Sequence, residues 1–231
     1  MRSVESIRSA LKQDRASLSV SLWSLMEAGA RMRDVAPHVD AIHVDVMDGR
    51  FVEAEMFTDP GVIAEAKDQG LLVDVHLMVE DVDKHLPGWI RAGADCISVH
   101  PQTTPDLRAT LGYLTEHKVL PSVVVELETD LARLAERLEG VGMLVVMGSK
   151  LGVKGCELDD RSYERPQALR RLLREHGRED IVVQHDGGNR AHSVPRLYQK
   201  GVDSFVLGSL FCTHPEMNYG QVANWMHSLR R

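Results

Sequence analysis

Eight short runs rich in Val, Ile and Leu recur along this chain, and segments with the spacing of amphipathic helices separate them. Repeated strand–helix units of this kind build a parallel sheet. Eight units in 231 residues favour a single-domain (β/α)8 TIM barrel over an open doubly wound sheet, because closure pairs every strand. The predicted strands are residues 17–22, 41–47, 71–78, 96–100, 122–127, 143–147, 181–185 and 204–209.

The segments around these runs indicate how the domain is organised. Residues 1–16 predict an additional amphipathic N-terminal helix that covers the bottom of the barrel, and residues 17–231 predict the catalytic barrel itself. The sequences AGADCISV and KGVDSFVL both place a Gly and an Asp before a strand, as at the end of a helix. No G-x-G-x-x-G follows the first predicted strand, which disfavours a dinucleotide-binding protein.

Charge and composition limit the partners. The net charge is -7, and Lys and Arg are spread along the chain, so the sequence predicts no binding to nucleic acid or to an acidic membrane surface. It has neither an apolar run long enough for a membrane span nor the apolar stretch of a signal peptide, which predicts a cytoplasmic protein with a small-molecule partner. Cys96, Cys156 and Cys212 have the spacing of neither a disulfide framework nor a zinc site.

Four polar residues stand near the carboxyl ends of three predicted strands, where TIM barrels place their active sites. His43 and Asp45 are two residues apart on one strand, so their side chains share a face. His76 lies near the end of the next strand, and Asp186 follows the seventh. We therefore expect two imidazoles and two carboxylates to converge on the barrel axis.

This group of nitrogen and oxygen donors suits one divalent metal ion, namely Zn(II), Fe(II), Mn(II) or Co(II), with positions left for substrate oxygens. Any one of the four residues, taken alone, is more simply explained as a hydrogen-bonded structural residue. Burying two carboxylates and two imidazoles together without a cation would be costly. The four residues together therefore predict a metal site.

Three motifs make the chain resemble the ribulose-phosphate 3-epimerase family from Ser17 to Thr213: HVDVMDG at 43–49, DVHLMVED at 74–81 and HDGG at 185–188. The resemblance implies an isomerase in which His43, Asp45, His76 and Asp186 bind the metal. It also implies that Asp45 and Asp186 are the acid/base pair. Inverting a carbon beside a ketone needs one group to remove a proton and another to deliver one to the opposite face.

The resemblance also implies a substrate-binding set. Ser21 aligns with a family Ser, although Val20 replaces the usual Pro, and three methionines at strand ends align with methionines that line the family's active site. Small residues after the last two strands would let a phosphate approach the backbone, and two glycines of the preceding loop match the family pattern. The predicted substrate-binding residues are Ser21, Met47, Met78, Met147, Gly152, Gly155, Gly187, Gly188, Gly208 and Ser209.

The loop after the sixth strand departs from the family pattern. It reads MGSKLGVKGCELDD, with Lys150-Leu151 where the family has Asn-Pro, and with Cys156 where it has Gln. In the family this loop closes over the substrate, so the departure leaves the identity of the sugar open. Lys150 and Lys154 are cations that could pair with a phosphate oxygen or remain solvated, and Arg190 could contact a phosphate or simply begin a helix. His100 ends the fourth strand, where a lone His is more often a packing residue.

The leading hypothesis is 3-epimerisation of a ketose phosphate, with D-ribulose 5-phosphate and D-xylulose 5-phosphate as the pair and allulose 6-phosphate as the rival substrate. A phosphosugar decarboxylase or aldolase-like synthase is disfavoured, because those families place a Lys on the third strand, where this chain has DVHLM. A noncatalytic phosphosugar-binding protein is the alternative of another class. The resemblance further implies a homo-oligomer.

Overall fold

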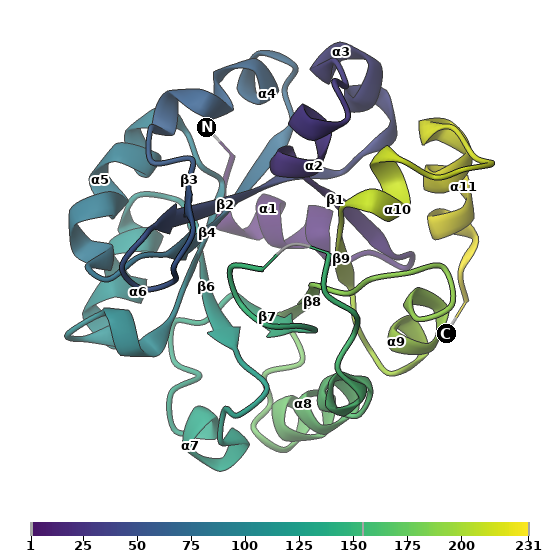
Figure 1. The fold of residues 1–231 in the computed structure, drawn as a ribbon. Helices are drawn as coiled ribbons and strands as arrows, with labels where there is room; N and C mark the ends of the chain where they lie inside the picture. Colours follow the sequence, from purple (N-terminus) through teal and green to yellow (C-terminus); the bar gives the residue numbers. More distant parts are fainter. Residues whose placement is uncertain (1, 154, 231) are drawn as a thin grey trace.

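Eight parallel strands close into a barrel in this computed structural model, which describes residues 2–153 and 155–230. Closure occurs because β1 pairs with both β2 and β9 (Figure 1). The other neighbours around the barrel follow chain order, which confirms the TIM-barrel prediction. The strands of the barrel are β1 Ser17–Ser21, β2 Ala41–Asp48, β4 Leu72–Met78, β5 Cys96–Val99, β6 Leu120–Val125, β7 Met143–Met147, β8 Val182–Asp186 and β9 Ser204–Leu207.

All eight predicted runs form strands, with ends shifted by no more than two residues. One further strand, β3 (Glu55–Met56), was not predicted. It pairs antiparallel with the end of β2 and extends that edge beyond the barrel. Two residues are too few to carry an alternating pattern, so this strand has no signature in the sequence.

Helices surround the barrel and connect its strands (Figure 1). They are α1 Val4–Leu11, α2 Leu22–Glu27, α3 Met32–Val35, α4 Ala64–Asp68, α5 Val82–Ala92, α6 Leu107–Glu116, α7 Leu131–Ala135, α8 Arg165–Glu175, α9 Val194–Gln199, α10 Ser209–Cys212 and α11 Tyr219–Ser228. Short 3-10 turns complete the connections, at Ala36–His38, Pro60–Ile63, Pro101–Thr103 and Asp160–Tyr163. Across residues 2–153 and 155–230, none of these helices has the length and hydrophobicity that a membrane span requires.

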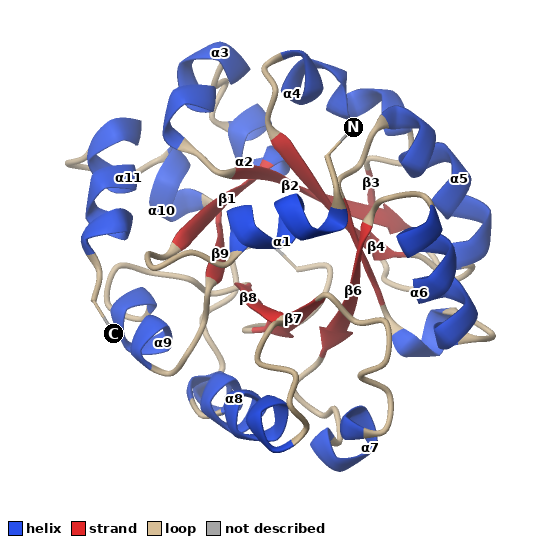
Figure 2. Cartoon of the chain, turned by 180° about the vertical axis from the view of Figure 1, so that it is seen from behind, coloured by secondary structure: helices blue, strands red, loops and turns tan. Residues whose placement is uncertain are grey.

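The predicted N-terminal helix is present as α1 and lies across the amino end of the barrel, as seen from behind in Figure 2. Its buried residues Ile7 and Leu11 pack on apolar side chains near the amino ends of the strands, among them Leu72 and Met143. Its first turn is capped by Ser3, whose hydroxyl accepts from the backbone N–H of Ser6. α1 therefore covers the bottom of the barrel as expected, while the domain boundary after residue 16 stays a prediction.

Side chains alternate along each strand between the helix layer and the barrel interior. On β2, Ile42, Val44 and Val46 belong to the main apolar core beneath the helices, so His43 and Asp45 face the interior. Both polar and apolar side chains fill the interior of the barrel. Its buried polar side chains at the inward positions below the site are Ser17, Ser19, Asp74, Ser98, Ser122, Gln184 and Ser204.

Aspartates fix the junctions at which helices lead into strands. Asp95 and Asp203, the two residues singled out by the repeated Gly–Asp pattern, accept a hydrogen bond from the backbone N–H of Val73 and Val183, each at 2.9 Å. Each carboxylate also pairs with a cation, Lys67 for Asp95 and an arginine for Asp203. These contacts lock neighbouring strands at the amino end and keep their carboxyl ends in register.

Candidate active site

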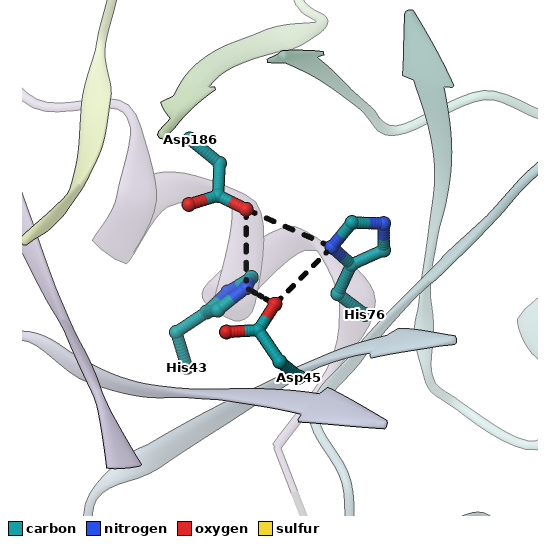
Figure 3. A group of neighbouring side chains, drawn as sticks. All are labelled: His43, Asp45, His76 and Asp186. Carbon is teal, nitrogen blue, oxygen red and sulfur yellow. Dashed lines mark hydrogen bonds and ion pairs between the residues drawn. The ribbon is translucent and has the colours of Figure 1, made fainter. Parts of the chain in front are cut away.

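The four predicted metal ligands converge at the carboxyl ends of β2, β4 and β8 (Figure 3). His43 Nε2 lies 3.3 Å from Asp45 Oδ1 and 3.6 Å from Asp186 Oδ2. His76 Nδ1 lies 3.5 Å from Asp45 Oδ1 and 3.6 Å from Asp186 Oδ2. Carboxylates and imidazoles thus alternate around a common centre, with the two carboxylates on opposite sides of it.

A buried carboxylate below the group orients His43. Asp74 Oδ2 lies 2.9 Å from His43 Nδ1 and accepts a further hydrogen bond of 2.9 Å from Gln184 Nε2. His43 Nδ1–H therefore donates downward, which leaves Nε2 for the centre. Sequence reasoning did not assign this role to Asp74, although its place two residues before His76 already indicates that it faces the barrel interior from β4.

Mutual proximity changes the acidity of these groups. Burial by itself would lower the pKa of His43, but the charges of Asp45, Asp74 and Asp186 outweigh it and raise the pKa well above its usual value. The pKa of His76 is raised in the same way against the effect of burial, by Asp186 and Asp45. Burial alone would raise the pKa of Asp45, but His43 and His76 hold it below the usual value. The centre therefore favours positive charge.

A cation fits this arrangement. One donor atom from each of the four residues lies within 4.8 Å of all the others. His76 Nδ1 is buried and, among the described residues, has no hydrogen-bond partner, although it points toward two carboxylates. Such an orphaned nitrogen is costly unless a cation occupies the centre. His43, Asp45, His76 and Asp186 could therefore hold a metal ion, which agrees with the sequence prediction.

A pocket opens above the centre, and Asp45, His76 and Asp186 lie at its floor, while His43 is buried beneath it. The structure brings all the predicted substrate-binding residues to its wall: Ser21, Met47, Met78, Met147, Gly152, Gly155, Gly187, Gly188, Gly208 and Ser209. Lys150 and Arg190 line it as well, whereas Lys154 lies outside the described residues. Sequence reasoning missed Trp23, Ser24, Ser149, Asn189 and Val206, which also line the pocket.

Two glycines allow the close packing beside the pocket. A Cβ on Gly188, whose φ is +68°, would lie 2.6 Å from the backbone Cα of Leu158. A Cβ on Gly148 would lie 2.2 Å from the carbonyl oxygen of Gly187. Only glycine lets the loop after β7 approach the turn after β8 this closely. These approaches fix the backbone directly after Asp186.

The family model described as the ribulose-phosphate 3 epimerase family matches residues 17–212. This chain belongs to that family. The ribulose-phosphate 3-epimerase of Bacillus subtilis is 29% identical over 87% of this chain and 88% of its own length. The enzyme of the same name from Escherichia coli K12 is 28% identical over 95% and 93%, and that from Aquifex aeolicus is 30% identical over 74% and 76%. The chain is thus a member of a family of isomerases that act as epimerases.

Solved structures share the fold at lower identity. A thiamine phosphate pyrophosphorylase from Pyrococcus furiosus superposes with a TM-score of 0.59 at 17% identity, covering 95% of this chain and 98% of that one. A 3-hexulose-6-phosphate synthase superposes with a TM-score of 0.57 at 17% identity, covering 93% and 100%. At this sequence identity the structural likeness establishes the barrel fold, and function has to be argued from the residues of the site.

Proposed function

We propose that this protein catalyses the metal-dependent 3-epimerisation of a ketose phosphate, with D-ribulose 5-phosphate and D-xylulose 5-phosphate as the pair. The observation that carries the proposal is the position of Asp45 and Asp186 on opposite sides of one centre at the floor of the pocket. Membership of the ribulose-phosphate 3-epimerase family supports it.

The two carboxylates supply the acid/base chemistry. One of them removes the proton from C3 of the bound sugar, and the other delivers a proton to the opposite face, so the configuration inverts. Asp45 and Asp186 exchange these roles when the reaction runs in reverse. A divalent ion held by His43, Asp45, His76 and Asp186 would act as a Lewis acid that stabilises the enediolate charge between the two proton transfers.

Three methionines shape the pocket around the reacting carbon. Met47, Met78 and Met147 are buried at the carboxyl ends of β2, β4 and β7 and line the pocket beside the two carboxylates. Their apolar side chains would exclude water from an enediolate that water could protonate on the wrong face. Thioether side chains are also flexible enough to fit both epimers.

Metal affinity is expected to fall as the pH falls. In the metal-free protein the carboxylates raise the pKa of His43 and of His76, so protons compete with the cation for both imidazoles. Lowering the pH from about 8 to about 6, across the range in which imidazoles titrate, should weaken Zn(II) binding. A competition titration with a chromophoric chelator at each pH measures the affinity, and a pH-independent affinity would contradict this expectation.

The part of the pocket wall formed by the turns after β8 and β9 is suited to the phosphate. Gly187 and Gly188 leave β8, Gly208 and Ser209 follow β9, and all four line the pocket. Arg190 also lines the pocket, and within the described part of the chain its guanidinium donates to the carbonyl oxygens of Asn189 and Cys156 and pairs with no carboxylate. Small residues that expose backbone N–H groups, together with a guanidinium, suit a phosphate dianion.

Arg190→Ala is therefore expected to raise KM for the ketose phosphate roughly tenfold or more, the size of one lost charge-assisted hydrogen bond, with little change in kcat. Arg190→Lys should restore part of the affinity, because the charge remains. Arg196→Ala is a matched control, since Arg196 packs over the Tyr163 ring and does not line the pocket. An unchanged KM in Arg190→Ala would remove this residue from the phosphate end.

The proposal is tested by incubating the metal-loaded protein in D₂O with D-ribulose 5-phosphate or with D-allulose 6-phosphate and following C3 by NMR. Formation of the epimer with deuterium at C3 is the expected result for the first sugar. Epimerisation of the second sugar alone would make allulose 6-phosphate the substrate. Metal and sugar binding without exchange at C3 would instead identify a noncatalytic phosphosugar-binding protein.

A further inference from the structure

His76 is connected to a second histidine and a glutamate that the proposed reaction does not use. His76 Nε2 lies 2.9 Å from His100 Nε2, and His100 Nδ1 lies 2.9 Å from Glu126 Oε1. Gln102 Nε2 donates to the same Glu126 oxygen at 2.6 Å. The three linked side chains come from neighbouring parts of the barrel wall: β4, the end of β5 and the end of β6.

The geometry is that of a true hydrogen bond between the imidazoles. Their ring centroids are 5.1 Å apart and the ring planes differ by 20°, while the two Nε2 atoms approach to 2.9 Å. Nearly coplanar rings with these separations meet end to end through their nitrogens. Phe51 packs against His100 with a centroid separation of 4.7 Å, and both histidines are fully buried, so neither ring can turn to water instead.

The chain of contacts permits only one direction of donation. Glu126 offers a carboxylate oxygen, so His100 Nδ1 must carry a hydrogen and donate it. A neutral His100 then has a lone pair at Nε2 and can only accept, so His76 Nε2 must carry a hydrogen and donate. A neutral His76 protonated at Nε2 has its lone pair at Nδ1, the atom that faces Asp45 and Asp186.

We infer that His100 and Glu126 are positioning residues that set the tautomer of His76 and thereby prepare Nδ1 as a metal ligand. The inference rests on the metal site of the proposed function and adds two residues that act through His76. Glu126 also reaches the wall of a neighbouring cavity, where 29% of its side chain is exposed. A partly exposed carboxylate at the rim of the barrel, Glu126, thus sets the tautomer of the fully buried metal ligand His76.

The test is Zn(II) affinity, measured by competition with a chromophoric chelator and independently of turnover. His100→Phe keeps a ring of similar size but removes the acceptor, and Glu126→Leu removes the carboxylate. Both should weaken Zn(II) binding about 10- to 100-fold, the usual effect of losing a partner of a metal-binding histidine. Glu126→Gln can still present an oxygen to His100 Nδ1–H and should bind Zn(II) nearly as tightly as the wild type.

Glu128→Leu is the matched control for loss of charge. Glu128 stands two residues after Glu126, is exposed, and pairs with Arg161 instead of a histidine, so its replacement should leave Zn(II) affinity unchanged. Thermal unfolding of the metal-free variants shows whether each one folds. Equal Zn(II) affinity in folded His100→Phe, Glu126→Leu and wild type would overturn the inference, whereas a wild type that binds no Zn(II) would overturn the proposed metal site itself.

Long-range ¹H–¹⁵N spectra of the imidazoles in the Zn(II)-loaded wild type provide a second test. A role in packing alone would not predict which ring nitrogens carry the hydrogens. The expected signature is a hydrogen on Nδ1 of His100 and a hydrogen on Nε2 of His76. A hydrogen on Nε2 of His100 in that sample would reverse the direction of donation and contradict the inference.

Discussion

Asp186→Asn is expected to lower kcat by about 10²- to 10⁴-fold at saturating metal, because asparagine can still offer an oxygen to a cation but cannot accept or deliver a proton. Steady-state kinetics with separate measurement of bound metal distinguishes loss of proton transfer from loss of the ion. The effect should be large in both directions, since each direction needs both carboxylates.

The same variant should separate exchange from epimerisation. With Asp186 replaced, Asp45 can still remove and return a proton on its own face, so one epimer should exchange its C3 hydrogen with D₂O without inverting. Asp45→Asn should show the complementary behaviour with the other epimer. Retained epimerisation in metal-loaded Asp186→Asn would exclude Asp186 from the acid/base pair and leave it, at most, as a metal ligand.

Gly148→Ala is expected to damage the site through the backbone. The new methyl group would lie 2.2 Å from the carbonyl oxygen of Gly187 and 2.3 Å from Cε1 of His185, the two neighbours of Asp186 in the chain. The first contact is with the backbone and the second is with the ring of a fully buried histidine, so the turn after β8 must shift. We expect a loss of about 1 to 3 kcal/mol in the free energy of unfolding, together with weaker metal binding and lower kcat.

Gly112→Ala is the matched control for the same chemical change. A Cβ at Gly112, within α6, meets nothing within 4 Å, and alanine stabilises an exposed helix interior by up to about 1 kcal/mol relative to glycine. Denaturant unfolding should therefore show a loss of stability in Gly148→Ala and none in Gly112→Ala, and a Zn(II) titration should show weaker binding in Gly148→Ala alone. Wild-type metal affinity and stability in Gly148→Ala would mean that the loop after β7 absorbs the clash without moving Asp186.

The sequence was sufficient to predict the barrel and its centre because both depend on alternation along strands. His43 and Asp45 are two residues apart on a strand whose other face is Ile42, Val44 and Val46, so the pattern itself fixes which side chains face the axis. The converging set could be predicted for the same reason: the strand ends of a TIM barrel meet at one face, and Asp186 stands at one of them.

What the sequence could not provide were contacts between strands. The hydrogen bonds of Asp74 with His43 and of His100 with His76 depend on the stagger between neighbouring strands, which periodicity within one strand does not encode. His100 therefore looked like an isolated packing residue. The pocket residues Trp23 and Asn189 lie after strand ends, where no repeating pattern marks a side chain as facing inward.

The helix that covers the amino end of the barrel bears on how hydrogen isotopes reach the product. With Ile7 and Leu11 packed into that end, solvent hydrogen approaches Asp45 and Asp186 through the mouth, where a bound sugar would stand in its way. The carboxylates then exchange hydrogen with solvent mainly between turnovers, when no sugar fills the mouth of the pocket. The deuterium that appears in the recovered starting sugar, relative to the amount of epimer formed in D₂O, would thus report how often the pocket opens per proton abstraction.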